Sequence, residues 1–307
     1  MGTPENVMQI NLFSLGTKLY NCQRWVNYRC VLVFVLRSLL HREEREALQR
    51  FLAGNALREQ FFEVHPEVFA QLTRQFFFRG STAAERLRSI TETYLQMEQY
   101  FSAATMELLY LDEARPFFIG SLPYREDKTL SIDMYFCRGE IREGSMTLAI
   151  RLDGAMIYHV NFWIWQEAEG PVLYIGCHQG SKHGLALNRE LTKAFFGYRP
   201  KNFILFALRI LAQELGVVRL RAVSDEGFYA NNHLRRDRKL RVSYDAFWRE
   251  CGGQPAVDPR FYELPLCEPR KTMEEIPTRK RATYRRRFAF LDETEARLRA
   301  AWTAHMR

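Results

Sequence analysis

The chain has 307 residues, 47% of them hydrophobic and 26% charged, which excludes a disordered or fibrous protein and allows a substantial core. Its formal net charge of +8 suits nucleic acid, anionic lipid or a phosphorylated ligand as a partner. The six cysteines form no CxxC pair and the N-terminus lacks a secretory signal pattern, so a reduced, cytoplasmic protein is expected.

Helical patterns dominate the first part of the chain, and we expect a helical region over residues 1–115. Apolar residues recur at helical spacing in Glu43–Leu52 and Ala83–Tyr100, with Ser81 as the N-cap of the second helix. The most apolar stretch, Cys30–Leu40, is too short to cross a bilayer, which needs about 20 residues. We expect a buried core helix there, with a position on a membrane surface as the alternative.

The periodicity changes near residue 116, and residues 116–307 predict a sheet flanked by helices. The Asp153-Gly154 dipeptide suits a two-residue hairpin turn between two strands. Strands are expected over Leu130–Cys137, Met146–Leu152, Met156–Trp165, Val172–Cys177, Val217–Val223 and Phe261–Leu266. Helices are expected over Ala186–Phe196, Lys201–Leu215 and Tyr244–Glu250, with a basic helix at the C-terminus. The fold class is therefore α+β.

The order of these elements resembles the GNAT superfamily of acyltransferases. The shared order is a strand meander, a Gly-containing loop, helix, strand, short helix and final strand. The resemblance implies a GNAT-like mixed, mostly antiparallel sheet after the helical region. It also implies a turn whose backbone N–H groups hold a pyrophosphate at a helix N-terminus.

The segment Ile175–Ala186 is the most chemically suggestive part of the chain. Its glycines allow close approach of a ligand, and the next helix points its positive end toward it. Gln179, Gly180, Lys182 and Gly184 are therefore candidates to hold the phosphates of an acyl carrier. The alternative is a tight strand-to-helix turn. Gln179 lies five residues before Gly184, whereas the acyltransferase pattern has three.

Arg199 and Lys201 flank a proline that is expected to begin a helix, because proline fits the first helical turn. Two cations at this end oppose the helix dipole. Binding of a phosphate or carboxylate by either residue would remove the conflict, so both are candidate cofactor-binding residues. The alternative is that both side chains are solvated.

His233, Asp245 and His178 are the candidate catalytic residues. His233 lies beyond a predicted strand, and a histidine on a loop has a pKa suited to a general base. Asp245 has the alternative role of a helix N-cap, for which Ser243 competes. His178 has no third metal ligand at regular spacing, and no metal site is expected.

Asp133, Tyr135, Ser224 and Trp248 are candidates for substrate contacts. Asp133 and Tyr135 share one face of a predicted strand, and such a polar face lines a cleft or meets solvent. Ser224 follows a predicted buried strand. Trp248 lies on a short helix, where core packing competes with a pocket wall.

Short motifs between Gln179 and Arg287 resemble the VirK/YbjX family of bacterial proteins. They include Gln179-Gly180, Arg199-Pro200-Lys201, Tyr244-Asp245-Ala246-Phe247-Trp248 and Lys280-Arg281. The resemblance implies a bacterial protein linked to virulence, envelope integrity and antimicrobial-peptide resistance. It implies no agreed chemistry.

Three functions are compatible with these features. The leading hypothesis is an acyltransferase-like enzyme that moves an acyl or aminoacyl group from acyl-CoA, acyl carrier protein or aminoacyl-tRNA to an amine, without a metal. The second is a non-enzymatic envelope protein that binds anionic lipid or nucleic acid through Arg279–Arg287, which holds six cations within nine residues. The third is a tailoring enzyme of a specialised metabolite or peptide. A cytoplasmic location is expected, with peripheral contact to the inner membrane as an extension.

Overall fold

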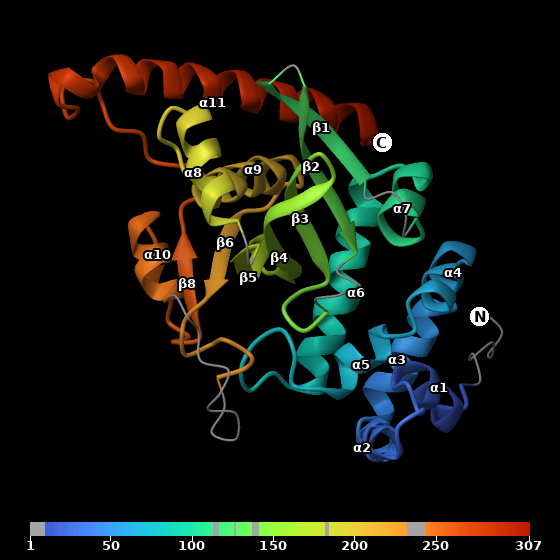
Figure 1. The fold of residues 1–307 in the computed structure, drawn as a ribbon. Helices are drawn as coiled ribbons and strands as arrows, with labels where there is room; N and C mark the ends of the chain where they lie inside the picture. Colours follow the sequence, from blue (N-terminus) through green and yellow to red (C-terminus); the bar gives the residue numbers. More distant parts are fainter. Residues whose placement is uncertain (1–9, 113–116, 126, 137–140, 182–183, 232–242) are drawn as a thin grey trace.

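A computed structural model of the chain describes residues 10–112, 117–125, 127–136, 141–181, 184–231 and 243–307. An eight-stranded sheet runs through these residues in the order β1-β2-β3-β4-β5-β6-β8-β7, with helices around it (Figure 1). Its neighbouring strands are antiparallel except for the pair β5 and β6. The expected α+β class with a mostly antiparallel sheet is therefore confirmed.

Helices form the region before the sheet, as predicted. They are α1 (Leu12–Leu19), α2 (Trp25–Leu40), α3 (Arg42–Leu52), α4 (Ala56–Val64), α5 (Val68–Thr73), α6 (Ala83–Tyr100) and α7 (Ala103–Tyr110). The N-cap expected at Ser81 is wrong by one residue. Thr82 and Glu85 form a reciprocal capping box at the start of α6, at the three-residue spacing that this motif requires.

The central strands follow the predicted meander. The strands are β1 (Phe117–Arg125), β2 (Lys128–Phe136), β3 (Met146–Leu152), β4 (Ala155–Glu167), β5 (Gly170–Gly180), β6 (Arg219–Val223), β7 (Gln254–Pro255) and β8 (Phe261–Leu264). Asp153 and Gly154 both have positive φ, 49° and 79°, so the predicted hairpin turn between β3 and β4 is confirmed. The prediction missed β1, the strand at one edge of the sheet.

Helices of the second half pack on one face of the sheet and around its end. They are α8 (Leu185–Ala194), α9 (Pro200–Glu214), α10 (Tyr244–Glu250) and α11 (Thr278–His305). Helix α9 packs on β3, β4 and β5, and its residues Phe203–Ala212 are all buried. Helix α11 packs along α9 and β1, where Trp302 is fully buried. Figure 1 shows α11 on the side of the molecule away from α1 and α2.

One extra residue interrupts the pairing of β4 with β5. Asn161 pairs with Cys177 and Phe162 with Ile175, which leaves Gly176 as a β-bulge. A Cβ atom at Gly176 would collide with the Glu143 carbonyl oxygen and approach the Trp163 ring to 2.7 Å. The bulge therefore requires glycine. Because β5 continues to Gly180, the first half of the Gly-rich segment Ile175–Ala186 is strand.

The change Gly176→Ala is expected to destabilise the protein by about 1–3 kcal/mol or more, because the added methyl group overpacks a closed site. Gly120→Ala in β1 is the matched control, since a Cβ there meets no atom within 4 Å. Urea unfolding of both variants measures the difference. Equal stability of the two variants would contradict the assignment of the bulge.

Candidate functional site

Polar side chains lie in two rows across four strands, on the face of the sheet opposite α9. The first row contains Asp133 of β2, which pairs with Ala149 of β3, then His159 of β4 and Gln179 of β5. Directly paired residues point to the same face of a sheet. With the neighbouring row and Arg151, the polar face consists of Asp133, Tyr135, Thr147, Arg151, His159, Asn161, Cys177 and Gln179.

Most of the polar face is buried. Asn161 and Cys177 have no exposed surface, and His159 and Asp133 are 3% and 5% exposed. A buried polar group costs free energy unless it is hydrogen-bonded, and an apolar residue would fill the same space more cheaply. Buried polar residues are therefore more informative than exposed ones, and their concentration here marks the candidate site.

A thiol and an imidazole lie side by side in the polar face. The Cys177 Sγ atom is 3.9 Å from the His159 Nε2 atom. Beside them, the Asn161 amide donates a hydrogen bond of 2.9 Å to the Thr147 hydroxyl. Burial, with a contribution from the Cys177 thiol, raises the pKa of Tyr244 well above its ordinary value. The Tyr244 hydroxyl therefore stays protonated and able to donate a hydrogen bond.

A carboxylate, a guanidinium and a phenol form the other end of the polar face. The Arg151 Nε atom lies 2.7 Å from an Asp133 carboxylate oxygen, and another Arg151 nitrogen donates to the Tyr135 hydroxyl at 3.4 Å. Burial raises the pKa of Asp133, although Arg151 opposes the increase. A buried carboxyl group with a raised pKa is a candidate for proton transfer.

The predicted phosphate-binding residues are at the carboxyl end of β5. Gln179 and Gly180 are exposed in the last two positions of the strand, and Gln179 shares its row with Asp133. Gly184 is the N-cap residue of α8, where the described residues provide no side-chain cap. The structure thus brings Gln179 and Asp133 onto one face, while Lys182 lies outside the described residues.

Arg199 and Lys201 both pair with a carboxylate of the protein itself. Arg199 forms a salt bridge with Glu250 at the end of α10, and the Lys201 ammonium is 3.6 Å from the other Glu250 oxygen. Desolvation and then the nearby Arg199 charge lower the pKa of Lys201. The carboxylate that the sequence required at this helix N-terminus is therefore supplied by Glu250.

His178 lies on the α9 face of β5, away from the polar face. Its Nε2–H group donates a 2.8 Å hydrogen bond to the Lys201 carbonyl oxygen. The ring centre is 4.9 Å from that of Tyr158 and 4.6 Å from that of Phe247. Burial lowers the pKa of His178 to about 3. Burial therefore keeps the imidazole neutral at physiological pH, and the surrounding contacts favour a packing role.

Asp245 and Ser224 hold the turn that follows β6. Asp245 accepts a 2.8 Å hydrogen bond from the backbone N–H of Asp225, and Ser243 is the N-cap of α10. The Ser224 hydroxyl donates to the Pro259 carbonyl oxygen at 2.8 Å. Neither residue is part of the polar face.

Trp248 packs in the core beside this turn. It is fully buried, and its indole N–H donates to the Val223 carbonyl oxygen at 2.8 Å. The remaining catalytic candidate, His233, lies outside the described residues. Within those residues, no group of three or more His, Cys, Asp or Glu side chains could hold a metal ion.

The sequence interpretation missed His159, Cys177 and Arg151 as members of the site. The sequence does carry one indication of this site, because His159 and Asn161 alternate with apolar residues on one strand and so share a face. Their meeting with Cys177 depends on the β4–β5 register and on the bulge, which local pattern does not specify.

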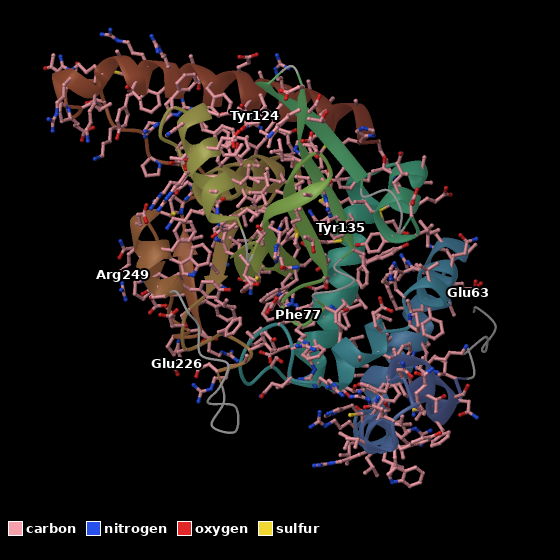
Figure 2. All side chains as sticks on the ribbon, in the orientation of Figure 1. Glu63, Phe77, Tyr124, Tyr135, Glu226 and Arg249 are labelled. Atoms are coloured by element: carbon pink, nitrogen blue, oxygen red, sulfur yellow. The ribbon has the colours of Figure 1, made fainter. Side chains whose placement is uncertain are left out.

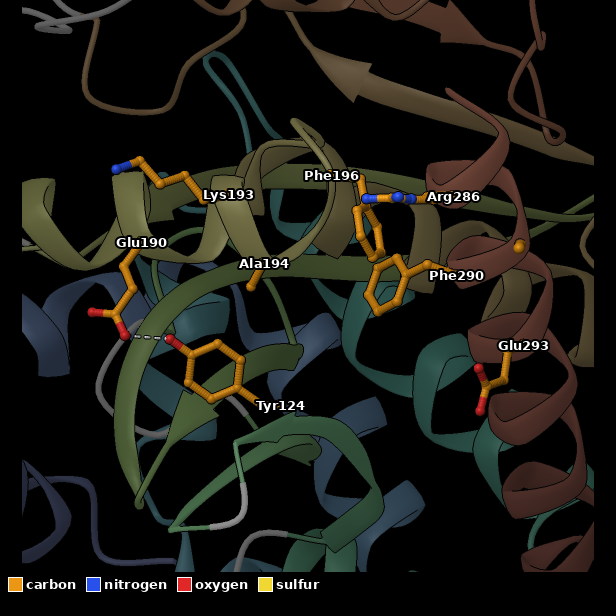
Figure 3. A pocket seen from close by; sticks show the side chains of 9 residues that line it. Tyr124, Glu190, Lys193, Ala194, Phe196, Arg286, Phe290 and Glu293 are labelled. Atoms are coloured by element: carbon orange, nitrogen blue, oxygen red, sulfur yellow. Dashed lines mark hydrogen bonds between the residues drawn. The ribbon is translucent and has the colours of Figure 1, made fainter. Parts of the chain in front are cut away.

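A cavity lies between β1, α8 and α11. Its volume is about 770 Å³, with Phe196 and Phe290 as apolar lining and Arg286 among its charged residues. Figure 3 shows the hydrogen bond from the Tyr124 hydroxyl to Glu190 at this site. The cavity therefore joins an apolar wall to the basic part of α11.

The comparisons with known proteins identify a family. The sequence model of a protein family, described as "Protein of unknown function (DUF535)", matches residues 23–300. The chain belongs to the DUF535 family. The uncharacterized protein YbjX of Escherichia coli K12 is 26% identical over 238 residues, covering 76% of this chain and 71% of YbjX. The expected resemblance to the VirK/YbjX family is thereby confirmed.

Two uncharacterized proteins of Haemophilus influenzae are also similar. One is 24% identical over 262 residues, which is 84% of each chain. The other is 29% identical over 219 residues, which is 69% of each chain. These three relatives are bacterial proteins, and none of their names states an activity.

The lowered pKa of His178 predicts a loss of stability in acid. Between the unfolded-state pKa of about 6.5 and the lower folded-state pKa, the unfolded chain binds a proton at His178 that the folded chain does not. The free energy of unfolding therefore decreases as the pH is lowered through this range, by up to about 1.4 kcal/mol per pH unit. His178→Gln keeps a donor near the Lys201 carbonyl and should flatten this slope. Urea unfolding from pH 7 to 4 measures it. The same slope in both proteins would contradict the neutral buried imidazole.

Proposed function

We propose that this chain is an acyltransferase-like enzyme that moves an acyl or aminoacyl group from an activated carrier to an amine. The observation that supports it is the buried polar face, which connects Asp133 to Gln179 through His159. Acyl transfer needs a proton acceptor, a hydrogen-bond donor for the oxyanion and a place for the carrier. The described residues offer a candidate for each.

The carrier is proposed to bind at the carboxyl end of β5. Strands β5 and β6 pair from Val172 and Arg219 to Ile175 and Ala222, and β5 then continues to Gly180 against β4. In α/β sheets, ligands usually bind beyond the carboxyl ends of neighbouring parallel strands. Carrier phosphates would lie near Gln179, Gly180 and the first N–H groups of α8. Acyl-CoA, acyl carrier protein and aminoacyl-tRNA all present such phosphates.

The chemical step is assigned to the polar face. Asp133 would take the proton of the attacking amine while the amine nitrogen bonds to the acyl carbon and the carrier sulfur or oxygen leaves. Burial raises the pKa of Asp133, so this carboxylate is a stronger base than an ordinary aspartate. The Tyr135 hydroxyl, which lies beside Arg151 at the Asp133 end of the polar face, would donate to the oxyanion or to the leaving atom. His233 remains an alternative base, as proposed from the sequence.

Asp133→Asn is expected to lower kcat/KM by about 100-fold, since general-base catalysis contributes on that order. The wild-type rate should rise with pH through the raised Asp133 pKa, because only the ionised carboxylate accepts a proton, and the variant should lose this limb. Mass spectrometry of the amide products formed with each of the three carriers measures the rate.

Asp292→Asn is the matched control, because Asp292 is an exposed carboxylate on α11. It should keep full activity. The proposal is contradicted if wild-type protein binds none of the three carriers in calorimetry and forms no product with any of them.

A second candidate function is binding of nucleic acid or anionic lipid by the first half of α11. Arg279, Lys280, Arg285 and Arg286 have no carboxylate partner within 4 Å among the described residues. In the second half of the helix, by contrast, Arg297 pairs with Glu293 and Arg299 with Glu295. Arg279 and Lys280 also lie in the first turn of α11, at the positive end of the helix dipole, so a bound anion would stabilise them.

The double change Arg285→Ala and Arg286→Ala should abolish salt-sensitive retention on RNA or on anionic vesicles. Arg287 is left in place because it donates two hydrogen bonds to the Phe196 carbonyl oxygen. Arg297→Ala removes one paired charge from the same helix and should have little effect. Retention that survives the double change would exclude this surface.

A further inference from the structure

One helix exposes a mainly apolar surface that also includes Arg29, four residues after Trp25 and three before Leu32. Large apolar side chains of α2 lie on its outer side, away from the other helices. This outer face of α2 consists of Trp25 (85% exposed), Val26 (74%), Leu32 (57%), Leu36 (60%), Leu39 (56%) and Leu40 (80%). Phe13 of the adjacent α1 is 51% exposed. Contiguous apolar surface of this kind marks an interaction site, whereas single exposed side chains do not.

The opposite side of α2 accounts for its place in the fold. Val31, Phe34 and Ser38 are buried, and the α1 backbone at Gly16 approaches Val31 so closely that a Cβ would lie 2.7 Å from it. The expectation of a buried core helix over Cys30–Leu40 is therefore correct for one side and wrong for the other. Packing within the described residues leaves the outer face of α2 without a cover.

The segment that contains α2 carries charge of one sign. Residues 10–42 contain Lys18, Arg24, Arg29, Arg37 and Arg42 but no Asp or Glu, and the first carboxylate is Glu43 of α3. Arg24, Arg29 and Arg37 are exposed, whereas Arg42 pairs with Glu46 of α3. A helix with an apolar face, flanking cations and a tryptophan has the composition of helices that lie in a membrane interface.

We infer that the outer face of α2 is a docking surface for an anionic lipid bilayer, on which α2 lies parallel to the membrane plane. Its apolar side chains would enter the acyl boundary while the flanking arginines meet lipid phosphates. No helix of the described residues is long and apolar enough to cross a membrane.

A second copy of the chain fits this surface less well. Two such faces would bring their arginines together, with no carboxylate in the segment to compensate. Anionic phosphates complement the same cations. Figures 1 and 2 show α1 and α2 at the end of the molecule remote from the basic part of α11. The two surfaces can therefore be tested separately.

Tryptophan fluorescence provides a direct test, because all five tryptophans are in described residues and four of them are buried. Trp25 alone is open to solvent. Full-length protein is mixed with vesicles of phosphatidylcholine alone or with about one third phosphatidylglycerol. We expect a blue shift and quenching by brominated lipid with the anionic vesicles only, weakened by salt and absent in Trp25→Phe.

Leu36→Glu combined with Leu40→Glu should lower partitioning into anionic vesicles by about tenfold or more, measured by flotation. Both side chains are exposed, so the fold should persist by circular dichroism. Val257→Glu is the matched control, because Val257 is fully exposed outside this surface. The double change Arg285→Ala and Arg286→Ala should leave the Trp25 signal unchanged.

Three results would overturn the inference. They are equal binding by the Leu36/Leu40 variant, equal binding to vesicles with and without anionic lipid, and no binding by folded wild-type protein. Analytical ultracentrifugation adds a fourth: a wild-type dimer that the Leu36/Leu40 variant dissociates would assign the surface to self-association instead.

Discussion

The extra residue at Gly176 determines how the second half of β5 is used. Side chains alternate between the faces of a strand, so one inserted residue exchanges the faces of everything that follows it. Before the bulge, Tyr174 stacks on Trp163 with ring centres 5.4 Å apart. After it, Cys177 and Gln179 join the polar face and His178 turns toward α9. The candidate site and the packing of α10 both depend on this inversion, and the inversion depends on the missing Cβ at Gly176.

Charges in the molecule separate into those that the protein neutralises and those that it leaves available. Arg199 and Lys201 oppose a helix dipole, yet Glu250 from α10 pairs with both and links the two helices. Asp133 and Arg151 also pair, but they do so within a buried polar face whose raised carboxyl pKa suits proton transfer. Among the described residues, several exposed cations have no carboxylate partner within 4 Å and are available to external anions, including Arg285 and Arg286 of α11 and Arg29 and Arg37 of α2.

Much of the fold could be predicted from local pattern, because period two and period 3.6 are local properties. The β3–β4 hairpin followed from Asp153-Gly154, and Ser243 was among the predicted caps of α10. The start of α6 was missed by one residue, since Ser81 and Thr82 both have capping side chains and the Glu85 spacing decides between them. For α2, an all-round apolar sequence cannot indicate which side is covered, because that depends on α1.

The candidate site was only partly predictable. Asp133 and Tyr135 stood out as polar residues alternating on one strand, whereas His159 and Cys177 became neighbours through pairing across strands. The most direct test of the central claim is a crystal structure with a non-hydrolysable acyl-carrier analogue. The proposed function predicts carrier phosphates at Gln179 to Gly184 and the acyl carbonyl group over the polar face, within hydrogen-bond reach of Tyr135 and close to Asp133. An analogue bound elsewhere, such as in the cavity beside α11, with the polar face unchanged, would contradict it.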